Sequence, residues 1–144
     1  MRALFLTAPR SFEYREAESV ETPPGWVRVR MRYVGICGSD VHYYAEGRIG
    51  DQEVKYPFIL GHEGSGEVSE GAGHFESGSL VYIEPAISCH RCDQCLAGRE
   101  NTCRNLRFLG NPLELPGCMQ EEISMPPGGM LVLIGIPEGM DRVS

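Results

Sequence analysis

The chain has almost no lysine. Lys55 is the only one among 144 residues, and the formal net charge is −7. The arginines are scattered, apart from Arg28, Arg30 and Arg32. An acidic chain of this kind argues against nucleic acid as a partner, because nucleic-acid binding depends on clustered positive charge. The absence of a polybasic segment argues in the same way against attachment to a membrane surface.

Long apolar stretches are also missing from the sequence. No run approaches the roughly 20 residues that a membrane-spanning helix needs. The N-terminal residues 1–16 lack the long apolar centre of a signal peptide and look like the start of a strand. A reducing, cytoplasmic setting is therefore the expectation. In that setting clustered cysteines bind metal more often than they form disulfides.

Glycine and proline, by contrast, are abundant. Eighteen glycines and ten prolines indicate many turns, short strands and short helices rather than long helices. Residues 26–35 alternate with period two, which predicts a half-buried strand with its arginines on a solvated face. Residues 80–85 and the apolar run 130–136 are further predicted strands, and residues 39–47 are a predicted short helix whose start is capped by Ser39 or Asp40.

Four of the six cysteines fall within fifteen residues. Cys89, Cys92, Cys95 and Cys103 have the spacing C-x2-C-x2-C-x7-C, which lets one loop surround a tetrahedral ion. A disulfide framework and an iron–sulfur cluster are the alternatives, but spacing and compartment together favour zinc. Sites with four cysteine ligands leave no coordination position open for substrate. The sequence therefore predicts a structural zinc lobe over residues 89–103.

A second group of candidate metal ligands lies upstream. Residues 35–44, GICGSDVHYY, contain Cys37, and residues 61–68, GHEGSGEV, contain His62 and Glu63. A thiolate, an imidazole and a carboxylate can form a three-ligand zinc site with one position open for substrate. Spacing alone does not bring these residues together, and on spacing alone a buried cysteine and a hydrogen-bonded core histidine are the favoured interpretation.

In their order along the chain, GICGSDVHYY, GHEGSGEV, IEPAISCHRCDQCLAGRENTC and RFLGNP resemble the medium-chain zinc-dependent alcohol dehydrogenases. The resemblance is strongest to the polyol branch, with sorbitol, iditol and xylitol dehydrogenases, and it covers residues 1 to about 127. It implies a GroES-like, mostly β partial barrel that carries the four-cysteine lobe. It also implies oxidation of a secondary alcohol of a polyol to a ketone, with NAD(P) as the electron acceptor.

The same resemblance implies two zinc ions, one catalytic and one structural, and a role for each motif residue. The implied catalytic-zinc ligands are Cys37, His62 and Glu63, and the implied structural-zinc ligands are Cys89, Cys92, Cys95 and Cys103. The implied proton relay consists of Ser39 and His42, and Asp40 is implied to orient a zinc ligand. Tyr43 and Phe108 match positions near the substrate pocket.

One part of the family pattern is absent from the sequence. No G-x-G-x-x-G motif occurs, so no cofactor-binding residue is predicted. Residues 1–127 are predicted to form the GroES-like catalytic domain, and residues 128–144 resemble a remnant strand of the missing cofactor domain. The alternative function is therefore a catalytically inactive zinc-binding module that lacks cofactor binding. Such a module is expected to form homo-oligomers or to associate with full-length relatives.

Overall fold

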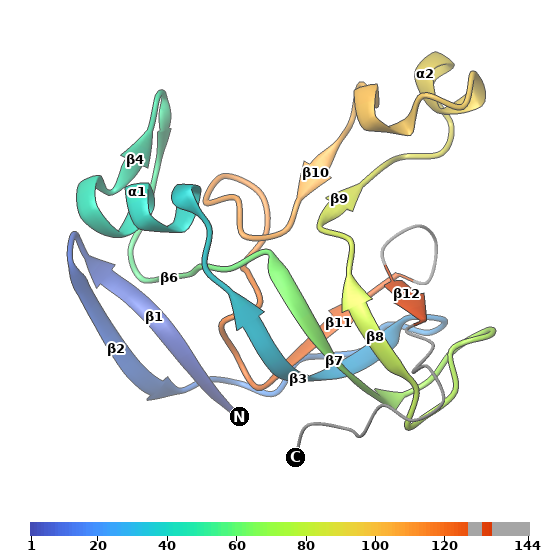
Figure 1. Cartoon of the computed structure of the whole chain (residues 1–144), viewed down its shortest axis with the longest axis horizontal. Coiled ribbons are helices and arrows are strands. Elements are labelled where there is room, and N and C mark those ends of the chain that lie inside the picture. The colour runs from blue at the N-terminus through green and yellow to red at the C-terminus, as the bar shows by residue number, and fades with distance from the viewer. Residues whose placement is uncertain (127–130, 134–144) are drawn as a thin grey trace, which may run out of the picture.

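The structure of the chain is a computed structural model that describes residues 1–126 and the backbone of residues 131–133. Strands dominate it, so the predicted mostly β fold is confirmed (Figure 1). The strands are β1 (Arg2–Ala8), β2 (Ser11–Glu16), β3 (Val27–Gly35), β4 (Arg48–Ile49), β5 (Gln52–Glu53), β6 (Phe58–Ile59), β7 (Glu63–Glu70), β8 (Leu80–Ile83), β9 (Ala86–Ile87), β10 (Arg107–Phe108), β11 (Glu122–Met125) and β12 (Leu131–Leu133). The helices are α1 (Gly38–Glu46), α2 (Asp93–Leu96) and a 3₁₀-helix at Glu100–Thr102.

A five-stranded sheet with the order β11-β3-β7-β8-β12 forms the centre of the fold. Alternate residues of each strand point to the same side of a sheet. The residues on the inner face of this sheet contribute to the main core. The buried members of this core are Val27, Val29, Val68, Phe75, Val81, Ile83, Ile87, Leu109, Cys118, Ile123 and Met125. Cys118 is fully buried, and burial raises the pKa of its thiol to about 12. Cys118 therefore acts as a small apolar core residue.

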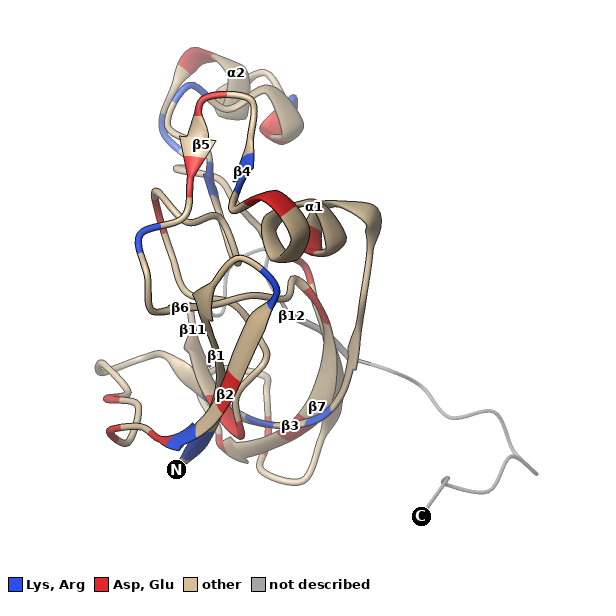
Figure 2. Ribbon diagram, turned by 90° about the vertical axis from the view of Figure 1, so that its left-hand side faces the viewer, with Lys and Arg blue, Asp and Glu red and all other residues tan. Residues whose placement is uncertain are grey.

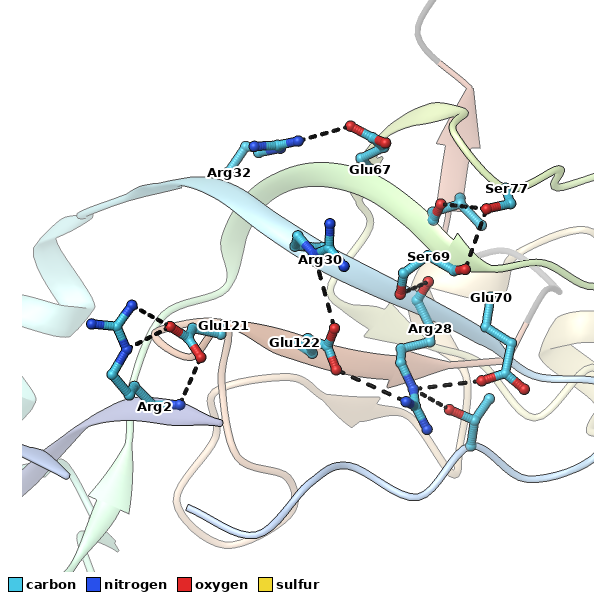
Figure 3. Close-up of polar contacts among 12 residues, drawn as sticks. Arg2, Arg28, Arg30, Arg32, Glu67, Ser69, Glu70, Ser77, Glu121 and Glu122 are labelled. Carbon is cyan, nitrogen blue, oxygen red and sulfur yellow. Dashed lines mark hydrogen bonds and ion pairs between the residues drawn. The ribbon is translucent and has the colours of Figure 1, made fainter. Parts of the chain in front are cut away.

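The outer face of the same sheet carries the three arginines of β3, each beside a carboxylate of a neighbouring strand (Figure 3). Arg28 lies 3.6 Å from Glu70, and Arg32 lies 3.0 Å from Glu67. Arg30 lies 4.0 Å from Glu122. These cross-strand pairs leave the arginine face polar and solvated, which confirms the prediction from the alternating sequence.

The alternation of β3 ends before the strand does. Val27 and Val29 are fully buried, but Tyr33 is 58% exposed, although its odd-numbered position predicts that it points the same way. The pairing of β3 with β7 shifts register between Met31 and Tyr33. A bulge of this kind adds a residue to one strand, so later side chains no longer follow the period of two.

A second, smaller core joins a three-stranded sheet, ordered β2-β1-β6, to helix α1. Leu6, Tyr43, Val54 and Leu60 are its buried members. In Figure 1, α1 lies above the blue β1–β2 hairpin and directly follows β3. This packing fixes the start of α1, where three of the predicted site residues lie.

The segment predicted to be a remnant strand lies partly outside the described residues. Within residues 128–144, the structure describes only Leu131–Leu133, which form β12 and pair antiparallel with β8. The register places Val132 opposite Tyr82 at the edge of the five-stranded sheet. The division into residues 1–127 and 128–144 stays a prediction, as does the strand over 130–136 beyond these three residues.

Among the described residues, no helix has both the length and the apolar character needed to cross a bilayer.

Candidate zinc centres

The four-cysteine lobe lies beyond β9 and β10, with α2 at its far end (Figure 1). Its sulfur atoms all lie within 4.8 Å of one another, and Cys92 Sγ lies 3.5 Å from Cys95 Sγ and 4.0 Å from Cys103 Sγ. Four sulfurs bound tetrahedrally to zinc at 2.3 Å would lie about 3.8 Å apart. None of the six cysteines forms a disulfide in the structure. The lobe therefore fits a tetrahedral zinc ion, as its spacing predicts.

Short-range contacts shape the loop around the sulfurs. Cys92 occupies the N-cap of α2, and the guanidinium of Arg104 binds Asp93 in the first turn, with Nη2 donating to Oδ2 at 2.8 Å. That guanidinium lowers the pKa of Asp93 to about 2. His90 is partly exposed and lies 3.2 Å from Glu100. It therefore adds a surface contact to the lobe, whose four sulfurs already form a complete set of candidate ligands.

The thiols of the lobe differ in acidity. The backbone N–H of Arg91, followed by the amide of Asn105, lowers the pKa of Cys89 to about 5. Desolvation raises the pKa of Cys95 to about 12, and the neighbouring thiols add to this. Cys89 is therefore a thiolate at neutral pH, whereas Cys95 holds its proton until a cation replaces it.

Zinc binding to the lobe should therefore release protons. At neutral pH, which lies below the pKa of Cys95, the thiol of Cys95 must lose its proton to bind zinc. We expect the zinc affinity to rise as the pH rises from about 6 to about 8, with net proton release at each pH. Calorimetry in buffers of different ionisation enthalpy measures both the zinc affinity and the number of protons released. Affinity that is independent of pH would contradict it.

The upstream candidate residues converge at the start of α1. Cys37 Sγ lies 3.2 Å from His62 Nε2, although 25 positions separate the two residues along the chain. A sulfur and a nitrogen bound to one tetrahedral zinc would lie about 3.6 Å apart. The side chain of Asp40 completes a group of three potential ligands within 4.8 Å. A soft sulfur beside an imidazole nitrogen is a donor set that suits zinc.

Asp40 connects the two chain segments that carry this group. Its carboxylate is 3% exposed, and it accepts hydrogen bonds from the backbone N–H of Cys37 at 3.1 Å and of Gly61 at 3.2 Å. The helix begins at Gly38, one residue earlier than predicted, and the predicted cap was wrong, because Cys37 is the N-cap and Asp40 lies at the third helical position. Asp40 Oδ1 also lies 3.8 Å from His62 Nδ1, which places the carboxylate where it can orient the imidazole.

The other predicted site residues lie at different distances from this group. Ser39 Oγ is 2.8 Å from Cys37 Sγ. His42 is on an exposed part of α1, with Nδ1 3.7 Å from Glu46. Glu63 lies outside the group of three, because its carboxylate is beside Gly35 at the end of β3. The structure thus brings Cys37, Ser39 and His62 together, and it places Glu63 and His42 outside this cluster.

A pocket of about 500 Å³ opens beside this group. It is lined by Ser39, Tyr43, Ile49, Gln52, His62, Leu106, Phe108, Gly110, Asn111 and Glu114. Tyr43 donates a hydrogen bond from its hydroxyl to Gln52 at 2.8 Å, and the ring of Phe108 lies 5.6 Å from the imidazole of His62. The two predicted substrate-pocket residues therefore line the same hollow as Ser39 and His62.

Sequence reasoning did not find Gln52, Asn111 and Glu114, which supply polar groups to this pocket. They come from β5 and from the loop after β10, and no local pattern marks them. The hydrogen bond from Tyr43 to Gln52 exists only because α1 packs against the β4–β5 hairpin.

A family comparison accounts for the arrangement. Residues 23–137 match the model of the alcohol dehydrogenase GroES-like domain. The chain belongs to this family. It is 46% identical over 89 residues to a sorbitol dehydrogenase of Bacillus subtilis, a match that covers 60% of this chain and 25% of the relative. An L-arabinitol 4-dehydrogenase of Aspergillus oryzae is 41% identical over 121 residues, which cover 82% of this chain and 31% of the relative.

Solved structures agree with the sequence comparison. The crystal structure of an NAD-dependent alcohol dehydrogenase superposes with a TM-score of 0.79 at 30% identity, covering 92% of this chain and 39% of that one. An alcohol dehydrogenase from Thermus sp. ATN1 superposes with a TM-score of 0.82 at 28% identity. This match covers 94% of this chain and 40% of that one. The chain thus has the GroES-like fold that the resemblance predicts. It spans between a quarter and two fifths of the length of the relatives that it matches.

Proposed function

We propose that this GroES-like chain provides the zinc centres and the substrate pocket for oxidation of a secondary alcohol of a polyol to a ketone, with NAD(P) as hydride acceptor. The observation that carries the proposal is the cluster of Cys37, Ser39 and His62, of which Ser39 and His62 line a pocket that holds further polar groups. A volume of about 500 Å³ falls within the range of small-molecule sites. The named relatives include sorbitol and L-arabinitol dehydrogenases, which supports a polyol as the substrate.

Two zinc ions are part of the proposal. The structural ion would be held by Cys89, Cys92, Cys95 and Cys103, and the catalytic ion by Cys37, His62 and Glu63. Glu63 must leave its place beside Gly35 to serve as the third ligand, because its carboxylate lies outside the group of three. When bound, zinc supplies Lewis acidity that lowers the pKa of an alcohol hydroxyl.

The chain's own residues would orient the alcohol and remove its proton. Ser39 is close enough to Cys37 Sγ for its hydroxyl to accept a hydrogen bond from a substrate hydroxyl at the metal. His42 lies almost one helical turn further along α1, at the solvent, where it can pass the proton onward. Tyr43 and Phe108 form apolar walls that limit the access of water to the reacting carbon.

Overall, the alcohol loses a hydride and a proton. The hydride reduces NAD(P)⁺ to NAD(P)H, and the proton leaves through Ser39 and His42. The described residues contain no dinucleotide-binding fold and the sequence contains no G-x-G-x-x-G, so no step at the cofactor follows from this chain's geometry.

Replacing Ser39 tests the proposal. In zinc-loaded chain assayed with NAD⁺ and sorbitol or xylitol, Ser39→Ala should lower kcat/KM by about 100-fold or more, the scale of a lost proton-transfer group. Ser69→Ala is the matched control, since the Ser69 hydroxyl bonds to the backbone of Arg28 in the sheet. Turnover is followed through NADH absorbance. Equal loss in both variants would contradict the role of Ser39, and zinc-loaded chain that neither binds NADH nor turns over would reject activity of this chain by itself.

The second candidate function is a zinc-binding module that does not turn over. The missing dinucleotide motif favours it. Such a module would form homo-oligomers or associate with full-length relatives, and gel filtration alone and in mixture with a sorbitol dehydrogenase would detect either. A monomeric profile in both experiments would argue against the association.

A further inference from the structure

A second pocket lies at the base of the four-cysteine lobe, and it is basic. It has a volume of about 500 Å³ and is lined by Ile87, Ser88, Cys89, Arg91, Asn105, Leu106 and Arg107. Arg107 and Phe108 are neighbours on β10, so their side chains point to opposite faces of that strand. Phe108 lines the pocket beside His62, and Arg107 lines this second pocket. The two pockets are therefore separate, with Leu106 lining both.

The two arginines of this pocket differ from most others in the chain. Ion pairs with carboxylates engage Arg2, Arg15, Arg28, Arg30, Arg32, Arg48 and Arg104. Within residues 1–126, no ion pair or side-chain hydrogen bond involves the guanidinium of Arg91 or that of Arg107. In a chain with a net charge of −7, these two exposed guanidinium groups line one hollow and are available to an anionic ligand.

No acidic side chain lines the pocket to neutralise them. The nearest acid in the hydrogen-bond network is Glu100, which already contacts His90 and the hydroxyl of Ser88. Asn105 adds an amide, whose Nδ2 lies 3.6 Å from Cys89 Sγ. An amide nitrogen has two N–H groups, so one remains for a ligand.

We propose that this pocket binds a phosphate monoester, with Arg91 and Arg107 as the residues that hold the phosphate group. Each guanidinium presents a planar fork of N–H donors that matches two phosphate oxygens. Two forks and an amide match a tetrahedral dianion better than a planar carboxylate, which offers only two oxygens. The volume leaves room for the organic part of a small phosphorylated metabolite.

A competing explanation is that the two arginines only balance the charge of zinc bound by four thiolates. Cys89 lines the same pocket, so this explanation is physically reasonable. The two explanations predict different effects of substituting the arginines. If the pocket binds phosphate, substitution lowers the affinity for phosphate. If the arginines only balance the charge of the zinc site, substitution lowers only the retention of zinc.

The test measures phosphate binding to the full, zinc-loaded chain by calorimetry, with inorganic phosphate and sorbitol 6-phosphate as separate probes. Arg91→Gln and Arg107→Gln should each weaken binding by about tenfold or more, since each removes a charged group that donates hydrogen bonds to the phosphate. Arg99→Gln is the matched control, because this lobe arginine donates to Gln94 and does not line the pocket. It should leave phosphate affinity unchanged.

Arg107→Lys separates the two explanations further. It keeps the positive charge, so zinc retention should be preserved, but it loses the planar fork and should still weaken phosphate binding. Zinc per chain is measured in every variant by elemental mass spectrometry. Tighter binding of the monoester than of inorganic phosphate would support a metabolite ligand, and equal binding would support recognition of the phosphate group alone.

Two results would overturn the proposal. One is the absence of saturable phosphate binding by the zinc-loaded chain. The other is faster zinc release from the glutamine variants with unchanged phosphate affinity. The experiment with inorganic phosphate involves neither NAD⁺ nor an alcohol, so a failure to bind phosphate would leave the proposed oxidation untouched.

Discussion

Replacing Cys95 with serine is expected to remove one of the two zinc ions proposed per chain and to disorder residues 89–103. Cys95 is buried in the middle of the lobe, where its sulfur lies 3.5 Å from that of Cys92. The lobe contains only α2, a 3₁₀-helix and turns, and the core cluster of the five-stranded sheet includes none of its residues. Its stability must therefore come mainly from the metal, as in other small zinc-dependent folds.

The expected size of the effect is large. Loss of a group that merely hydrogen-bonds a zinc ligand typically costs 10–100-fold in metal affinity, so loss of a ligand should cost more than about 100-fold. Zinc per chain is measured by elemental mass spectrometry, and order in the lobe by amide hydrogen exchange. Cys118→Ala is the control, since it removes a cysteine that belongs to neither cluster. Unchanged zinc content in Cys95→Ser would contradict the assignment of the four cysteines.

Asp40→Ala is expected to reduce stability and to abolish zinc binding at Cys37 and His62. The substitution leaves the backbone N–H groups of Cys37 and Gly61 without the carboxylate that accepts both. Hydrogen bonds to a charged group contribute about 1.5–3 kcal/mol each, and the deprived donors are hard to hydrate because Asp40 is 3% exposed. We expect the free energy of unfolding to fall by about 3–5 kcal/mol, measured by urea denaturation.

Two further variants serve as comparisons for Asp40→Ala. Asp40→Asn keeps one acceptor oxygen of the two, so its loss of stability should be smaller than that of Asp40→Ala. Asp93→Asn is the control for removing a carboxylate, because Asp93 is exposed and pairs with Arg104 on the surface. It should change the free energy of unfolding much less than Asp40→Ala does, because exposed ion pairs contribute little to stability. Equal effects of Asp40→Ala and Asp93→Asn would contradict the proposed role of Asp40.

The sequence by itself determined the features that depend on local spacing. Four cysteines within fifteen residues can surround one ion almost regardless of the rest of the chain, and the structure brings their sulfurs within 4.8 Å. The alternation of residues 26–35 predicted the strand β3 and its arginine face for the same reason, because side chains on a strand alternate. The family motifs added the GroES-like fold.

The tertiary structure decided everything that depends on distant segments. Cys37 and His62 meet because β3 pairs with β7 and because Asp40 binds the backbone of both chain segments. No local pattern encodes the bulge that exposes Tyr33, the pairing of β12 with β8, or the place of Glu63 beside Gly35. The two basic residues of the lobe pocket also come together only in the fold, since β9 and β10 must pair before Arg91 and Arg107 line one hollow. Such contacts depend on which strands neighbour each other, and that choice is made by packing of the whole core rather than by the residues at the site.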